Sequence, residues 1–299
     1  MSLDRNIETL THSHVFLGER HDENARRTLW VVVLTAAMMV AEIVAGLAFN
    51  SMALLADGFH MATHAGALGV AAIAYAYAKR HAQSGRYSFG TGKVGDLAGF
   101  ASALFLAMVS IGIAVESAVR LVDPVTVAFG EAAVMATVGL AVNLISAWLL
   151  GHGRDHHGHG HGHSHGQDNN LRSAYLHVLA DALTSVLAIS ALLGGYFLGW
   201  AWLDPAVGIL GAAVIAVWAW TLIRDTASVL LDAADPALAH KIREAVEGPG
   251  DARIVDLHVW RVGPGAYAAI VSVAGIARET VRERLVPVHE IEHLTVEVR

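Results

Sequence analysis

The sequence predicts an all-α membrane bundle of six transmembrane helices, followed by a small α+β domain in the cytoplasm. Composition is the first observation: 55% of the 299 residues are hydrophobic, 16% are charged, and the mean hydropathy is +0.48. Soluble domains contain about 25% charged residues. The second observation is a set of six apolar runs, each about as long as the roughly 20 helical residues that cross a bilayer. The third is a return to ordinary charge density after residue 225.

The membrane domain is predicted to cover residues 27–225 and to follow a polar cytoplasmic segment, residues 1–26. Lys and Arg are concentrated in that segment, between the second and third runs, and between the fourth and fifth. Since basic residues mark the cytoplasmic side of a membrane protein, we expect both termini in the cytoplasm. The expected spans are residues 28–48, 52–77, 94–119, 127–150, 171–199 and 203–223.

Residues 226–299 are predicted to form a cytoplasmic domain with the element order αββαβ. Two segments of alternating apolar and polar residues flank Gly263-Pro264-Gly265, a turn signal, and therefore predict a hairpin. Two segments with helical spacing and a last alternating segment complete the domain. In chain order the elements are a helix over 238–246, strands over 254–262 and 267–273, a helix over 279–285 and a strand over 294–298.

Two pairs of metal-binding residue types lie inside apolar runs, each pair with a spacing of four residues. His60 and His64 lie in the second run, and His177 and Asp181 lie in the fifth. Positions i and i+4 share one face of a helix, so each pair can hold one metal ion and the two helices together can supply four ligands. A single buried histidine is more often an interior hydrogen-bonding group, but two such pairs predict a metal site within the membrane.

The ligand types restrict the metal. Three imidazoles and one carboxylate suit Co²⁺, Ni²⁺ or Zn²⁺, whereas Ca²⁺ and Mg²⁺ prefer oxygen ligands. The chain has no cysteine, which excludes a thiolate site. Asp57, three residues before His60, is a candidate fifth ligand, a partner that orients His60, or a helix-end group near water, and we favour the last two. Glu42 and Asn143, in the first and fourth runs, either line an access path or form hydrogen bonds between helices.

Further histidines lie outside the apolar runs. The segment 151–168 interleaves histidine with glycine and predicts a flexible cytoplasmic loop, which either collects metal or is a tolerated expansion with weak metal affinity. Its candidate ligands are His152, His156, His157, His159, His161, His163 and His165. In the C-terminal domain, metal ligation and a surface or hydrogen-bonded position are equally good interpretations of His240, His258, His289 and His293.

The pattern favours transport over enzymatic catalysis. Zinc metalloproteases carry Glu directly after the first histidine of H-E-x-x-H, but Met61 follows His60 in this chain. No G-x-x-x-x-G-K-S/T motif occurs, so we expect neither nucleotide-driven transport nor a cofactor besides the transported metal. Imidazole binds metal only when it is neutral, so metal and protons compete for these ligands. We therefore expect proton-driven metal efflux across the lipid bilayer, without a nucleic-acid partner.

Four segments carry a family resemblance. They are Ser51–His60 (SMALLADGFH), Arg86–Lys93 (RYSFGTGK), Asn170–Asp181 (NLRSAYLHVLAD) and Leu257–Trp260 (LHVW). On these segments the chain, from Leu29 to Arg299, resembles the cation diffusion facilitator family. The resemblance implies six transmembrane helices, a metallochaperone-like C-terminal domain, a homodimer and exchange of metal for protons. It also implies that His60, His64, His177 and Asp181 form the transport site.

The resemblance also bears on the choice of metal. Zinc exporters of this family usually carry Asp at the position of His64, and Glu near Gly95 in the stretch Phe89–Asp96. Both differences resemble the cobalt- and nickel-exporting, divalent metal efflux branch, although imidazole does not by itself select Co²⁺ or Ni²⁺ over Zn²⁺. We expect a homodimeric, multi-pass exporter of Co²⁺ or Ni²⁺ in the inner membrane, with Zn²⁺ as a further candidate cargo. The alternatives are a zinc exporter of the same family, and a membrane metal sensor or buffer that moves no ions.

Overall fold

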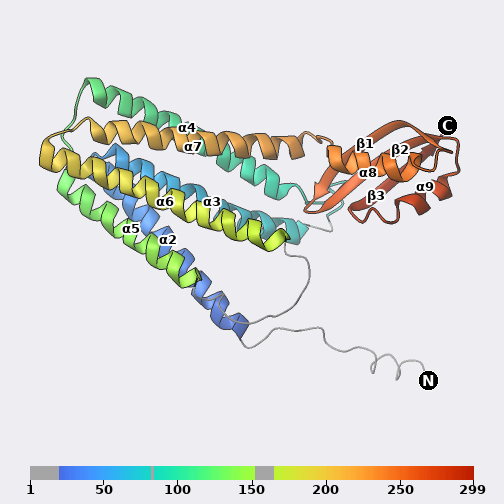
Figure 1. Cartoon of the computed structure of the whole chain (residues 1–299), viewed down its shortest axis with the longest axis horizontal. Coiled ribbons are helices and arrows are strands. Elements are labelled where there is room, and N and C mark those ends of the chain that lie inside the picture. Colours follow the sequence, from blue (N-terminus) through green and yellow to red (C-terminus); the bar gives the residue numbers. More distant parts are fainter. Residues whose placement is uncertain (1–19, 82–83, 152–164) are drawn as a thin grey trace.

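The computed structural model describes residues 20–81, 84–151 and 165–299 (Figure 1). Within these ranges, the side chains of residues 20–32, 64–65, 67–68, 147, 149–151 and 165–181 are not described. The six candidate loop histidines between positions 152 and 163 therefore lie outside the described residues.

Six long helices within the described residues form an elongated bundle. They are α2 (Arg20–Ala48), α3 (Met52–His81), α4 (Val94–Val122), α5 (Phe129–Gly151), α6 (His165–Leu198) and α7 (Leu203–Leu230). α4 packs on α7, α2 packs on α5, and α3 and α6 lie between these two pairs (Figure 1). Each helix contains most or all of one predicted apolar run. However, α6 begins inside the segment 151–168 that was expected to be a loop, and α2 begins inside the expected N-terminal segment.

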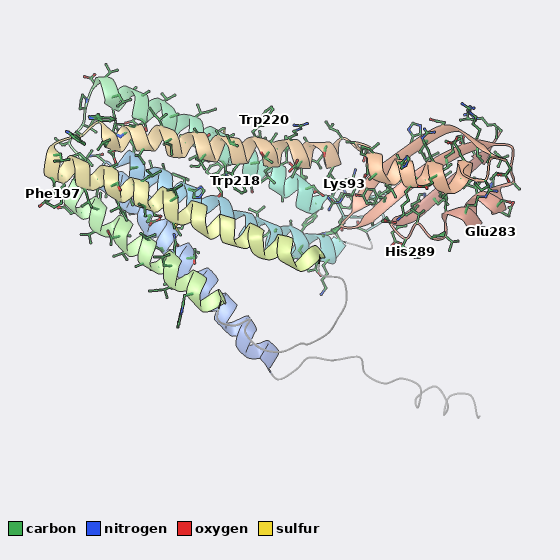
Figure 2. All side chains as sticks on the ribbon, in the orientation of Figure 1. Lys93, Phe197, Trp218, Trp220, Glu283 and His289 are labelled. Atoms are coloured by element: carbon green, nitrogen blue, oxygen red, sulfur yellow. The ribbon has the colours of Figure 1, made fainter. Side chains whose placement is uncertain are left out.

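The bundle has an apolar outer surface and an interior of small residues. Three stretches of the described chain are long and apolar enough to cross a membrane, namely Val94–Val122, Phe129–Ser146 and Leu203–Leu230. Trp218 and Trp220 project from α7 and are 50% and 68% exposed (Figure 2). Most buried residues of the bundle are alanine, serine or glycine. Small interior residues let helices approach closely in lipid, where the hydrophobic effect does not drive them together.

The C-terminal domain has the predicted element order. It contains α8 (Pro236–Glu247), β1 (Arg253–Gly263), β2 (Ala266–Ala274), α9 (Arg278–Leu285) and β3 (Ile291–Val298). β2 is the central strand, antiparallel to β1 and parallel to β3. The two helices bury Ile242, Val246 and Val281 against Val271 and Val273 of β2. The third strand begins three residues earlier than the predicted segment 294–298.

The turn between α3 and α4 contacts the C-terminal domain. Lys93 forms an ion pair with Asp232, which follows α7, and lies at the junction in Figure 2. The ring of Phe89 makes edge contacts with Trp260 and His293, at centroid distances of 5.7 and 5.5 Å. The helix that carries His60 is thus connected to the soluble domain through the turn that follows it.

Candidate metal site

α3 is the central helix of the site because it packs against α2, α4, α6 and α7. Asp57 and His60 lie on its second and third turns, and each is only 3% exposed. Both line a small cavity, in which the centre of a water molecule can occupy a volume of about 10 Å³. That volume is roughly what a cavity needs in order to hold one water. Thr184 of α6 and Gly211 of α7 lie on its other walls. A single small ligand could therefore lie beside His60.

Asp57 connects α3 to α6. Its Oδ2 accepts a hydrogen bond of 2.8 Å from the buried Ser185 hydroxyl. Burial in the second turn excludes the interpretation of Asp57 as a solvated helix-end group. Asp181 precedes Ser185 by four residues on α6, and His177 lies one turn earlier. The turn of α6 that touches α3 at the level of the cavity is therefore the turn that follows the predicted ligands.

The structure describes one of the four predicted ligand side chains, that of His60. His64 lies one turn further along α3, and His177 and Asp181 lie on α6, but their side chains are outside the described set. Among the described side chains, no three His, Asp or Glu groups converge. The four-ligand site therefore stays a prediction, with the two helices that would form it already in contact.

Two glycines of α7 bring this helix against α3, and the sequence analysis did not identify them. A Cβ added at Gly208 would lie 2.7 Å from the Cβ of Met52, and one at Gly211 would lie 2.7 Å from the Cβ of Ala56. Both distances are too short for real side chains, so only glycine permits this approach. A spacing of small residues along α7 was the signal in the sequence, but it is common in membrane helices.

Asp204, at the start of α7, caps α3 from outside that helix. Its carboxylate accepts hydrogen bonds from Ser51 Oγ (2.6 Å), Met52 N (2.8 Å) and Ala53 N (3.2 Å). The first N–H groups of a helix have no hydrogen-bond acceptor within the helix. In α3 the buried Asp204 side chain of α7 is the acceptor for two of them. Asp204 thereby fixes the position of the first turn of α3 relative to α7.

The two other polar residues predicted inside the bundle differ in their contacts. Asn143 of α5 donates a hydrogen bond to Met61 Sδ at 3.5 Å, which is a contact between helices. Glu42 of α2 is fully buried, and neither of its carboxyl oxygens has a hydrogen-bond partner among the described residues. One interpretation of Glu42 was a hydrogen bond between helices, and the described residues form no such bond with it.

The candidate histidines of the C-terminal domain lie on separate elements. His240 is on α8, His258 on β1, His289 before β3 and His293 on β3, and all four are exposed. His258 Nε2 lies 3.0 Å from Asp256 Oδ2, and the ring of His293 contacts Phe89. His165 is the first residue of α6, and its side chain is not described. Metal binding by these histidines stays a prediction.

Comparison with known proteins decides the class of transporter. A model of the cation efflux transmembrane domain matches residues 28–231. This chain belongs to the cation efflux family. The family resemblance found in the sequence is thereby confirmed: the protein is a membrane transporter for divalent metal cations, and not an enzyme.

Several bacterial members of the family are similar over most of their length. The zinc transporter ZitB of Escherichia coli (strain K12) is 34% identical over 297 residues, which cover 96% of this chain and 91% of the relative. The metal cation efflux system protein CzcD of Cupriavidus metallidurans is 33% identical over 86% of this chain and 79% of the relative. The cadmium, cobalt and zinc/H(+)-K(+) antiporter of Bacillus subtilis (strain 168) is 30% identical, over 93% of this chain and 87% of the relative.

Proposed function

We propose that the protein exports Co²⁺ or Ni²⁺ from the cytoplasm in exchange for protons, through a site formed by His60, His64, His177 and Asp181. The observation that carries this proposal is the cavity beside the buried His60, because its walls include α6, the helix with the other predicted ligand pair. Ionisable groups inside a membrane domain usually mark an ion pathway.

The exchange for protons follows from the ligand chemistry. A protonated imidazole cannot bind metal, so a site with three imidazoles releases metal as it takes up protons. The name of the Bacillus subtilis relative, a cadmium, cobalt and zinc/H(+)-K(+) antiporter, supports an antiport mechanism. A proton gradient across the membrane would then drive metal out of the cell without nucleotide hydrolysis.

The proposed orientation places six spans in the inner membrane with both termini in the cytoplasm. The basic residues Lys79, Arg80 and Lys93 lie at the end of the bundle that meets the C-terminal domain (Figures 1 and 2). Basic residues concentrate on the cytoplasmic side, so this end and the C-terminal domain would both face the cytoplasm. We also propose a homodimer, on the family resemblance of the sequence.

Zinc export is the second candidate function. The names of the ZitB relatives favour it, whereas His64, at the position of the usual Asp of zinc exporters, favours Co²⁺ or Ni²⁺. Affinity alone does not decide between these metals, because an N and O donor site binds all three.

Transport by purified protein in liposomes tests both candidates. Co²⁺, Ni²⁺ and Zn²⁺ are offered separately, with and without a pH gradient, to the wild type, His64→Asp and Asp181→Ala. We expect pH-driven Co²⁺ or Ni²⁺ transport by the wild type, a shift toward Zn²⁺ in His64→Asp, and no transport in Asp181→Ala. Predominant Zn²⁺ transport by the wild type and by His64→Asp would show a zinc exporter. Metal binding without flux would show a sensor or buffer, and flux that ignores the pH gradient would refute proton exchange.

A further inference from the structure

Glu42 is an unusual residue in this bundle. It is fully buried on α2, and neither carboxyl oxygen has a hydrogen-bond partner among the described residues. Buried polar side chains almost always have such a partner, and lipid cannot provide one. The two other buried acids described in the bundle do have partners, since Asp57 accepts from Ser185 and Asp204 caps α3. The position of Glu42 therefore needs an explanation other than a packing hydrogen bond.

Glycines from two neighbouring helices lie against Glu42, one beside its carboxyl group and one beside its Cβ. A Cβ added at Gly139 of α5 would overlap Glu42 Oε1 and lie 2.8 Å from its Cδ. On α3, a Cβ added at Gly58 would lie 3.2 Å from the Cβ of Glu42. Any larger residue at Gly139 would exclude the carboxyl group from its present position. α5 and α3 thus leave room for an acidic side chain.

Glu42 has an acidic group nearby, and it forms no ion pair with a described residue. Asp57 on α3 is close enough to disfavour a negative charge on Glu42. Gly139 of α5 and Met38 of α2 also lie near the carboxyl group, and neither residue carries a charge. Two neighbouring carboxylates without a cation repel each other, and an ionised carboxylate without hydrogen bonds is costly to bury. A neutral carboxylic acid is therefore the form of Glu42 that fits this arrangement.

We propose that Glu42 is a proton-binding group of the transport cycle, additional to the predicted metal ligands. This inference rests on the proposed exchange of metal for protons. Without metal, Glu42 holds a proton. A divalent cation arriving beside His60 attracts negative charge, so the O–H bond of the Glu42 carboxyl group breaks and the proton passes to water on the open side. When the metal leaves, Glu42 takes up a proton again. Each cycle thereby moves one proton besides those exchanged by the ligands.

The proton-to-metal ratio of transport tests this role. Metal and proton fluxes are measured together in liposomes, with a metal-sensitive and a pH-sensitive dye, for the wild type, Glu42→Gln and Glu131→Gln, and the metal offered is Co²⁺, Ni²⁺ or Zn²⁺, whichever the wild type carries fastest. Glu131 is an exposed glutamate on α5 and serves as the matched control. We expect the ratio to fall by one proton per metal ion in Glu42→Gln and to stay unchanged in Glu131→Gln. An unchanged ratio in Glu42→Gln would overturn the proposal. A wild type that moves the metal without protons would instead refute the proposed antiport.

Infrared difference spectroscopy keeps the inference testable if Glu42→Gln does not fold. Spectra of the wild type with and without Zn²⁺, in H₂O and in D₂O, report whether a protonated carboxyl group is lost on metal binding. We expect such a loss, with the C=O band shifted in D₂O and moved in frequency in Glu42→Asp, which keeps the acid. A wild-type spectrum without the loss, or a band that is unaffected in Glu42→Asp, would overturn the proposal.

Discussion

Replacement of Asp204 by alanine tests how α7 holds α3. The wild-type carboxylate accepts three hydrogen bonds, from Ser51 Oγ and the backbone N–H groups of Met52 and Ala53. All four residues are buried, so water cannot replace the lost acceptor. Each buried donor left without a partner costs about 1–3 kcal/mol. Since the first turn of α3 can relax in part, we expect Asp204→Ala to lower the free energy of unfolding by about 3–5 kcal/mol.

Thermal unfolding in detergent measures this loss. For a domain of about 200 residues, 1 kcal/mol shifts Tm by roughly 2–4 °C, so we expect a decrease on the order of 10 °C. Asp225→Ala is the matched control, because Asp225 lies on the same helix but is exposed. Ser51→Ala should cost less in the Asp204→Ala background than in the wild type, since the bond from Ser51 to Asp204 is already lost there and only the bond from Leu54 N to Ser51 Oγ remains to be removed. Equal Tm values for Asp204→Ala and Asp225→Ala would refute the assignment of Asp204 as the cap of α3.

Two further predictions concern the cavity wall and the soluble domain. Gly211→Val places a side chain against Ala56, whose Cβ lies 2.7 Å from a Cβ at position 211. We expect this overpacking to lower the free energy of unfolding by about 1–3 kcal/mol and to abolish metal transport in liposomes. The control Gly112→Val changes a glycine with open space around it and should transport normally. Hydrogen bonds from Arg284 hold the pKa of the Asp251 carboxyl group below its usual range. The stabilisation by this pair should therefore be complete above about pH 4, the unfolded value, and disappear as the pH falls through the lower folded value. Hydrogen exchange in α9 of the wild type and Asp251→Asn should differ at neutral pH and converge in acid, and a difference that persists in acid would contradict this account.

The positions of the helices could be predicted well because hydrophobic length is a local property of the chain. Helix α3 begins at Met52, as expected, and α7 begins at Leu203. The ends were less accurate. The apolar run of α7 ends near Ile223, but the helix continues to Leu230, because hydropathy marks where lipid contact ends and a helix can continue into water.

The candidate site could be predicted only in part. The i, i+4 spacing indicated which residues share a helix face, and the structure places the buried His60 beside a small cavity. The contact of Asp57 with Ser185 joins residues that are 128 positions apart. No local pattern specifies such a pair, because it depends on how two helices pack.

The sequence alone predicted a membrane transporter for divalent metals, through its apolar runs, its paired metal-binding residue types and the pattern of its C-terminal domain. Those properties depend on residue type and spacing along one element, which the chain states directly. Only the tertiary structure decided that Asp204 caps a distant helix, that Gly208 and Gly211 bring α7 against α3, and that Glu42 lies against Gly139. The physical reason is that each of these roles belongs to a contact between helices. The same aspartate, glycine or glutamate would read identically in the sequence if it faced lipid or water.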